Sequence, residues 1–70
     1  MPHTALERAV EKVGGQSAFA RLHNVSQPTV WAWLKQRKPL PAEFVLKTET
    51  ETGISRHDLR PDIYPREDAA

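Results

Sequence analysis

Side chains able to read a nucleic-acid base are concentrated between residues 27 and 32 of this chain. The amide of Gln27 can accept and donate hydrogen bonds together, which suits the N6 and N7 edge of an adenine, and the methyl groups of Thr29 and Ala32 suit a thymine methyl. We therefore expect base contacts from Gln27, Thr29 and Ala32. The alternatives are an ordinary solvated glutamine at the start of a helix and two small exposed side chains.

Trp31 and Trp33 lie two positions apart, and this spacing gives a second signal. At about 100° per residue, two such residues cannot lie on the same face of a helix. Trp33 fits the apolar pattern, so we expect Trp31 to be partly exposed, and a large exposed aromatic side chain commonly marks an interface. Trp31 could pack against the sugars and thymine methyl groups of DNA, or it could cover the segment near Leu40.

A further group of polar and basic residues could bind phosphates. Such contacts set the register of a protein on DNA without carrying sequence information. A helix beginning near Gln16 would present free backbone N–H groups, which favour a phosphate. The residues expected at phosphates are Gln16, Ser17, Ser26, Lys35, Arg37 and Lys38. For Arg37 and Lys38 the alternative is an ordinary solvated loop.

Residues 16–36 have the spacing of a helix-turn-helix, which would position all of these side chains. The motif needs a small residue where its two helices nearly touch, and Ala20 meets that need. Asn24 falls at the turn, where the backbone must be left-handed and asparagine is tolerated. Ser26 can cap the second of the two helices, with Pro28 in its first turn. The expected core of the motif is Phe19, Ala20, Val25, Val30, Trp33 and Leu34.

Helices are also expected on both sides of this motif. Thr4-Ala5-Leu6-Glu7 has the form of a capping box, and Gly14-Gly15 would end the helix that it begins. A proline-stiffened connector leads to a fourth helix over about 42–52, which Gly53 ends. Ser55-Arg56-His57-Asp58 has the form of a second capping box and predicts a last turn of helix over 56–60, stopped by Pro61.

The C-terminal segment is expected to be tied down by two residues. Ile63 and Tyr64 look suited to anchor it to the core, whereas residues 65–70 have little to bury and are expected to be a disordered tail. Seventy residues are enough for one domain with a small core. We therefore expect a single helix-turn-helix domain over residues 1–64.

The composition narrows the class of protein. The net charge is only +1, but residues 1–38 carry +4 and residues 39–70 carry −3, so one face can be positive. No cysteine is present, which suits a reducing cytoplasm, and no apolar run approaches the roughly 20 residues of a membrane span. No metal cluster, phosphate loop or catalytic arrangement can be assembled, so we expect a cytoplasmic protein that is no enzyme and needs no cofactor or membrane.

The histidines and the C-terminal arginines are expected to have structural roles. His23 should be half-buried near the carboxyl end of its helix, whereas His3 and His57 should face solvent. The neighbouring Asp58 and Asp62 suggest surface ion pairs with Arg56 and Arg60. Such pairs stabilise little.

Several stretches of the chain resemble phage Cro and the bacterial YdaS-like antitoxin repressors, which are small lambda-repressor-like domains. The stretches are Val13-Gly14-Gly15-Gln16-Ser17, Val25-Ser26-Gln27-Pro28-Thr29-Val30, Trp33-Leu34, Pro41-Ala42-Glu43 and Arg56-His57-Asp58-Leu59-Arg60-Pro61-Asp62-Ile63-Tyr64. The resemblance implies that Gln16 contacts the DNA backbone beside Gln27, and that Gln27, Pro28 and Trp31 face bases. The chain departs from the family pattern at Asn24, where glycine is usual, and at His23, where an aliphatic residue is usual.

The sequence therefore predicts an all-α protein, a compact bundle of four to five short helices. Its expected function is that of a sequence-specific transcriptional repressor whose third helix reads the major groove of an operator. The resemblance places such proteins in prophages or toxin operons, in the cytoplasm of a bacterial or phage-infected cell. The alternative is a protein-interaction adaptor, or an antitoxin that binds a toxin through its acidic C-terminal half.

A module of this size buries limited surface on DNA, so we expect a homodimer, at least on the operator. The fourth and fifth helices, including Phe44 and Tyr64, are one candidate for the dimer surface. A sheet formed between two copies of residues 54–64 is the other.

Overall fold

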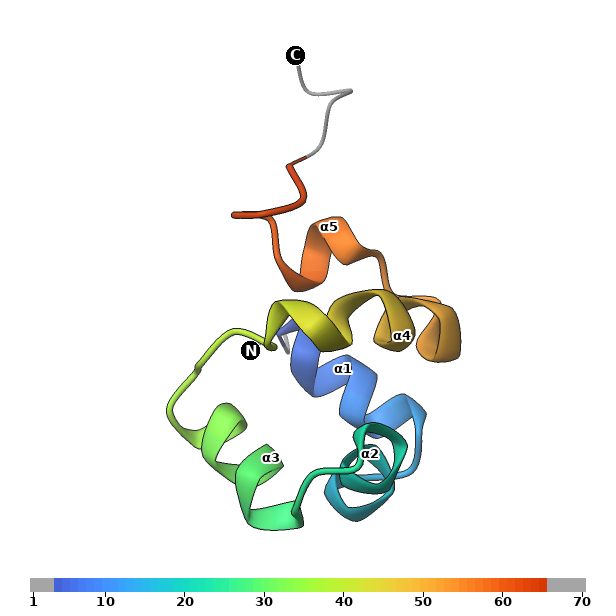
Figure 1. Cartoon of the computed structure of the whole chain (residues 1–70), viewed down its shortest axis with the longest axis vertical. Coiled ribbons are helices and arrows are strands. Elements are labelled where there is room, and N and C mark those ends of the chain that lie inside the picture. Colours follow the sequence, from blue (N-terminus) through green and yellow to red (C-terminus); the bar gives the residue numbers. More distant parts are fainter. Residues whose placement is uncertain (1–3, 66–70) are drawn as a thin grey trace.

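The described part of the chain folds into five helices. The computed structural model describes residues 4–65, and within that range it contains α1 (Ala5–Lys12), α2 (Gln16–His23), α3 (Gln27–Lys35), α4 (Ala42–Thr52) and α5 (Arg56–Leu59), with no strand. In Figure 1, α4 crosses the middle of the molecule, with α1, α2 and α3 below it and α5 above it. The all-α class and the small bundle predicted from the sequence are confirmed.

The first helix begins and ends at the predicted signals. The Thr4 hydroxyl accepts from the Glu7 N–H at 3.1 Å, and Glu7 Oε1 accepts from the Thr4 N–H at 3.2 Å, so the capping box is complete. Gly14 and Gly15 have φ values of 102° and 114°, which side chains with a Cβ rarely adopt. This glycine pair therefore allows α2 to start immediately after α1.

The turn between α2 and α3 also has the predicted geometry. Asn24 is left-handed, with φ 56° and ψ 43°, and the Val25 N–H donates to the Ala20 carbonyl at 2.9 Å. Ser26 caps α3 by accepting from the Thr29 N–H at 3.3 Å, with Pro28 in the first turn. Residues 16–36 thus form a helix-turn-helix.

The end of α3 differs from the expectation of a simple proline-stiffened connector. Arg37 has a positive φ of 53°, and the Lys38 N–H donates to the Trp33 carbonyl at 2.9 Å. This closing turn satisfies a carbonyl that the helix end would leave unpaired, and glycine usually occupies its left-handed position. No local pattern predicts this turn, because arginine is an uncommon residue at a left-handed position.

The core is built from one or more residues of every helix and from the connector between α3 and α4. The buried apolar residues are Leu6, Ala9, Val10, Phe19, Ala20, Val30, Leu40, Val45 and Leu59. Val25, Trp33 and Leu34 are half-buried against this cluster, as are Phe44 and Tyr64. The six residues predicted for the core of the motif all pack there, with Phe19 and Val30 fully buried.

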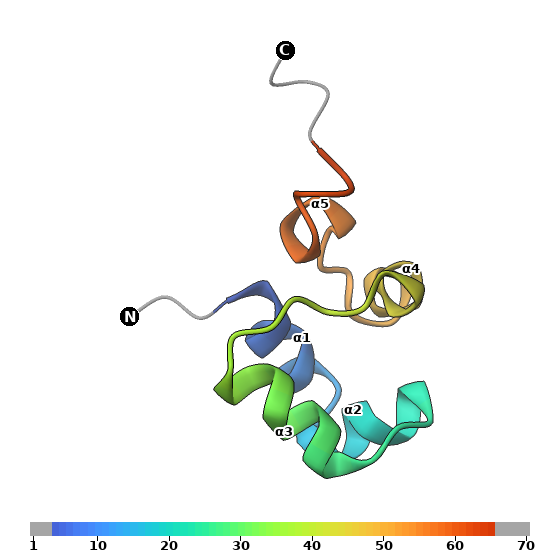
Figure 2. The ribbon, with the colours of Figure 1, turned by 60° about the vertical axis from the view of Figure 1, so that its left-hand side comes forward.

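The helix-turn-helix and the C-terminal segment lie at opposite ends of the molecule. Figure 2 shows α2 and α3 side by side at the lower end, with α5 and residues 60–65 at the upper end. Among residues 4–65, no helix is long and apolar enough to cross a membrane. The arrangement leaves one side of α3 on the periphery of the molecule.

Two expectations for the C-terminal segment need correction. The last helix ends at Leu59 rather than residue 60, because Arg60 takes an extended φ of −141°, as the residue before a proline usually does. Ser55 caps this helix by accepting from the His57 N–H at 3.1 Å. Ile63 is 42% exposed and does not anchor the segment, whereas Tyr64 packs against the core. The predicted tail lies outside the described residues after Pro65.

Candidate nucleic-acid interface

Helix α3 presents two faces of different character. Val30 is fully buried, and Trp33 and Leu34 pack against the core beside it. On the other side the side chains are accessible: Gln27, Pro28, Trp31 and Lys35 are exposed, and Thr29 and Ala32 are half-buried. All five candidate base-contacting residues therefore lie on a helix with one free side.

Gln27 is held in place by a partner from α2. Its Nε2 donates to Gln16 Oε1 at 2.5 Å, across eleven residues of sequence. An amide side chain has two N–H donors and a carbonyl acceptor, so this bond leaves Gln27 one donor and its Oε1. Those are the two groups that an adenine edge requires. The pairing also agrees with the position beside Gln27 that the family resemblance implies for Gln16.

Trp31 is exposed, as the spacing of the two tryptophans predicted. The indole has 48% of its surface accessible, and Lys35 Nζ lies 5.2 Å from the ring centroid, within the range of a cation–π contact. Trp33, and not Trp31, lines the pocket beside Leu40. Trp31 instead shares a shallow pocket with Gln16, Lys35 and Arg37.

The candidate phosphate-binding residues surround this face. Gly15 is the N-cap of α2 and supplies no side-chain cap, so the first N–H groups of α2, at Gln16 and Ser17, are not capped by a side chain. The N-terminus of a helix carries partial positive charge and suits an anion. Four other candidates are also exposed: Ser26 lies immediately before α3, Lys35 is its last residue, and Arg37 and Lys38 follow it. Ser26 Oγ is also 2.8 Å from Thr29 Oγ1.

The charge around this face is mostly positive, and Glu7 of α1 lines a shallow pocket together with Gln16, Trp31, Lys35 and Arg37. From Lys12 to Ala42 the sequence contains no aspartate or glutamate, and it contains five basic residues: Lys12, Arg21, Lys35, Arg37 and Lys38. The split in charge noted above is therefore sharpest in the segment that holds α2, α3 and the connector. A surface of this kind favours a polyanion as its partner.

His23 joins the helix-turn-helix to α4 and is more deeply buried than expected. Its side chain is only 6% exposed, between the rings of Phe19 and Phe44 at centroid distances of 4.7 and 4.8 Å. Nε2 lies 2.8 Å from the buried Thr48 hydroxyl, and Nδ1 has no partner among the described residues. Burial, with a smaller effect of the nearby Lys47 charge, lowers the pKa of His23 below 6.5. The ring is therefore a neutral structural contact near pH 7.

One of the two arginines, Arg56, has a different partner from the one expected. Arg56 forms a salt bridge with Glu49 at 2.9 Å, and its N–H donates to Glu49 Oε2 at 2.8 Å, which lowers the pKa of that carboxyl group. The predicted pair of Arg60 and Asp62 is present, with Nη2 and Oδ2 2.6 Å apart. The error for Arg56 has a simple cause: the bend between α4 and α5 brings Glu49 close, which nearness in sequence could not indicate.

Two more contacts fix this segment. Arg60 Nη1 donates to the Leu40 carbonyl at 2.7 Å, which ties the segment to the connector after α3. His57 is half-buried and its Nδ1 donates to the Tyr64 carbonyl at 2.7 Å, so the expectation that it faces solvent is wrong. His3 lies outside the described residues.

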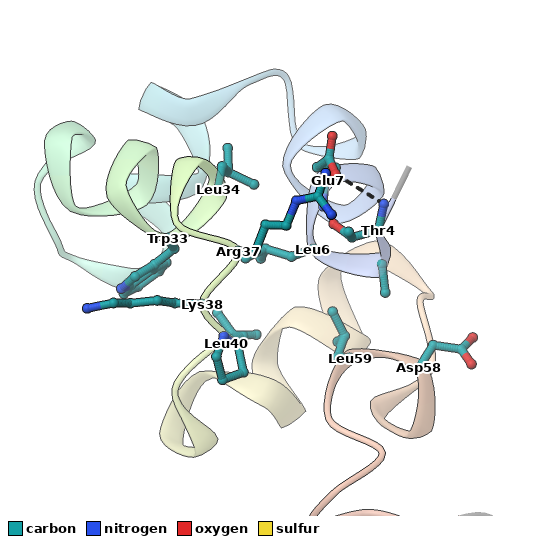
Figure 3. Close-up of a pocket in the computed structure, with 12 residues that line it drawn as sticks. Thr4, Leu6, Glu7, Trp33, Leu34, Arg37, Lys38, Leu40, Asp58 and Leu59 are labelled. Atoms are coloured by element: carbon teal, nitrogen blue, oxygen red, sulfur yellow. Dashed lines mark hydrogen bonds between the residues drawn. The ribbon is translucent and has the colours of Figure 1, made fainter. Parts of the chain in front are cut away.

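A small pocket lies behind the end of α3. It has a volume of about 150 Å³ and is bounded by the start of α1, the connector and α5, with Trp33, Leu40 and Leu59 among its lining. Figure 3 shows Lys38 extending past the Trp33 ring. Within residues 4–65, no group of three or more histidine, cysteine, aspartate or glutamate side chains could hold a metal ion. The pocket therefore lies where the ends of several segments meet. The candidate functional surface is the outward side of α3.

Comparison with known proteins identifies relatives of the whole domain. The family model described as "Bacterial toxin YdaS" matches residues 6–68. The chain is 43% identical over 61 residues to a protein of Escherichia coli (strain K12) described as "Putative transcriptional regulator YdaS", and the match covers 84% of this chain. The match spans 62% of that relative's length. No solved structure matches the chain.

Proposed function

This chain belongs to the YdaS family, and on that basis we propose that it is a sequence-specific DNA-binding transcriptional repressor. The observation that carries the proposal is the free side of α3, on which Gln27 is exposed and oriented by Gln16 within a segment that lacks carboxylates. The E. coli relative is described as a transcriptional regulator, which supports the same class of function. Helix α3 enters the major groove, and α2 lies across the backbone.

Gln27 is the principal reader of a base in this proposal. Its remaining N–H and its Oε1 contact N7 and N6 of an adenine, while the bond to Gln16 fixes the plane of the amide. Pro28, Thr29, Trp31 and Ala32 contact the bases on either side. Because Gln16 is already oriented at the start of α2, its other amide atoms can reach the neighbouring phosphate.

Phosphate contacts at both ends of the motif fix the register of the protein on DNA. The first N–H groups of α2, at Gln16 and Ser17, face one phosphate, together with Ser26 at the start of α3. Lys35, Arg37 and Lys38 bind phosphates beyond the other end of α3. These six residues supply affinity that depends on salt, whereas the base contacts supply specificity.

The protein acts as a homodimer on its operator, and it represses by occupying a promoter. One small module buries too little surface for useful affinity, whereas two copies on half-sites about 10 base pairs apart would double the contacts. The dimer surface is formed by α4 and α5. Residues 56–59 are helical in the described chain, which favours this surface over a sheet of residues 54–64.

The proposal is tested by selecting duplexes from a random pool with the full chain. The expected result is an inverted repeat, and transcription in vitro from a promoter that carries it should fall when the protein is added. Failure to select any duplex would overturn the proposal and favour the protein-interaction alternative, in which the acidic C-terminal half binds a partner such as a toxin. A rise in transcript would instead indicate an activator.

Gln27→Ala provides a test at one residue. Loss of its contact should relax the preference at a single base pair and weaken binding to the selected duplex by about 1–3 kcal/mol. Gln36→Ala is the matched control, because Gln36 is an exposed glutamine at the C-cap of the same helix. Fluorescence anisotropy with duplexes altered at each position measures both effects. Equal results for the two variants would remove Gln27 from the base-reading residues.

A further inference from the structure

The exposed indole on α3 indicates which kind of base the protein recognises. We propose that Trp31 reads the 5-methyl group of a pyrimidine in the major groove, so that the chain distinguishes thymine from uracil and 5-methylcytosine from cytosine. This inference rests on the proposed DNA-binding function and names the chemical group that one of its side chains selects.

Gln27, Trp31 and Lys35 are spaced four residues apart and all are exposed, so they form one stripe along α3. The stripe places an amide, an indole and an ammonium group in that order along the helix. An amide suits a base edge and an ammonium suits a phosphate. Trp31 lies between these two and offers mainly apolar surface.

The ring of Trp31 is oriented before any ligand arrives. Lys35 Nζ lies 5.2 Å from its centroid, so one face of the indole is occupied by a cation from the next turn of the helix. The side chain remains 48% exposed, which makes it the most exposed of the large hydrophobic residues described. A side chain that is held in place and left open to solvent is suited to a contact with a partner.

The chemistry of the major groove limits what that contact can be. The base edges there are hydrogen-bond donors and acceptors, and the apolar group among them is the C5 methyl of thymine, which 5-methylcytosine shares. An indole face gains by covering such a methyl group and gains little from a polar edge. The segment 12–42 has five basic residues and no carboxylate, which favours DNA over a protein as the molecule that covers Trp31.

The experiment uses the duplex selected by the full chain, with each thymine replaced in turn by uracil. Uracil differs from thymine only in lacking the methyl group. We expect one or two positions per half-site at which affinity falls about three- to fivefold, the amount expected for one buried methyl group. At such a position, 5-methylcytosine should bind more tightly than cytosine.

Trp31→Ala should bind both forms of the duplex equally at those positions, since the indole contributes nothing to the buried core. Leu46→Ala is the control for loss of an exposed apolar side chain: Leu46 is 47% exposed on α4, and its replacement should leave the ratio of affinities for the two duplexes unchanged, whatever its effect on dimer formation. If the wild-type chain selects a duplex but no methyl group affects its affinity, the inference is wrong and the proposed function stands. Discrimination that persists in Trp31→Ala would assign Trp31 to another partner, and absence of any DNA binding would overturn both.

Discussion

Basic side chains have different surroundings in the two halves of this molecule. In the C-terminal half, Arg56 pairs with Glu49, Arg60 pairs with Asp62, and Lys47 donates to the Leu22 carbonyl at 2.8 Å. In the segment 12–42 the basic residues have no carboxylate of their own segment, and Lys35, Arg37 and Lys38 are exposed. One set of basic side chains holds the C-terminal segment in place, whereas the other lies exposed at the candidate nucleic-acid interface, where Lys35 also contacts the Trp31 ring.

The polar contacts of the C-terminal half stabilise its path rather than form a site. The backbone N–H and the guanidinium of Arg56 both bind Glu49, so the short helix α5 is fixed against α4. Arg60 reaches the connector at the Leu40 carbonyl. These bonds position the connector, and the connector follows directly from the end of α3. The two halves are therefore coupled through the chain that links them.

The largest effect is expected from removing the three exposed charges at and after the end of α3. The triple variant Lys35→Gln, Arg37→Gln, Lys38→Gln should lower affinity for the selected duplex roughly a hundredfold at physiological salt, because each phosphate contact contributes through counterion release. The slope of log affinity against log salt should become less steep by about three. Anisotropy titrations between low and moderate salt measure the slope.

Arg56→Gln is the control from the other half. This change removes a charge that already has a partner, so the midpoint of thermal unfolding should fall while the salt slope stays as in the wild type. If Arg56→Gln reduces the slope of log affinity against log salt as much as a single change in the connector does, the basic residues of the two halves do not differ in their role in DNA binding.

An effect of intermediate size is expected from His23, where the two halves meet. Its pKa is lowered in the folded state, so the unfolded chain binds a proton more readily as the pH falls below about 6.5. The contribution of His23 to the free energy of unfolding should therefore be fully present above that pH. Below it, the free energy of unfolding should fall by up to about 1.4 kcal/mol per pH unit, until the pH reaches the pKa of His23 in the folded state. Urea titrations at several pH values measure this slope.

Two variants separate His23 from other titrating groups. His23→Leu should remove most of the slope between pH 7 and 5, whatever its effect on stability at neutral pH, because a protonated ring would otherwise leave Nδ1 as a buried donor without an acceptor. His57→Gln, in the C-terminal half, should keep the slope. If the free energy of unfolding of His23→Leu varies with pH as steeply as that of the wild type, His23 is not the group whose protonation destabilises the packing of α2 against α4.

The smallest effect is expected from the two left-handed residues that carry side chains. Asn24 and Arg37 have φ values of 56° and 53°, and glycine adopts this conformation without strain. Asn24→Gly and Arg37→Gly should each change the free energy of unfolding by less than about 1 kcal/mol, since relief of strain is offset by the greater freedom of the unfolded chain. Urea titrations measure this change.

The same two variants also test whether the charge of Arg37 contributes to DNA binding. Asn24→Gly should bind the selected duplex as the wild type does, whereas Arg37→Gly should bind more weakly and reduce the salt slope by about one. Because both variants alter the backbone in the same way, a difference between them reports the charge of Arg37. Unaltered binding by Arg37→Gly would place Arg37 among the ordinary solvated residues of the loop.

Much of the fold could be predicted because its signals are local. Thr4, Gly15, Ser26 and Gly53 each act on the backbone within a few residues, so the starts of α1, α2 and α3 and the end of α4 follow from the printed sequence. The helical spacing of the apolar residues also identified the inner face of α3. The left-handed Arg37 could not be predicted in this way, because its conformation follows from how the connector must return to the core at Leu40.

The sequence by itself determined the five helices, the turn at Asn24 and which side of α3 is free, because caps, left-handed residues and helical periodicity act over one or two turns. Only the tertiary structure decided that Gln16 meets Gln27, that His23 is enclosed by Phe44 and Thr48, and that Arg56 pairs with Glu49. Each of these contacts joins residues seven to twenty-five positions apart. Their partners depend on how the helices pack, and no local pattern records that packing.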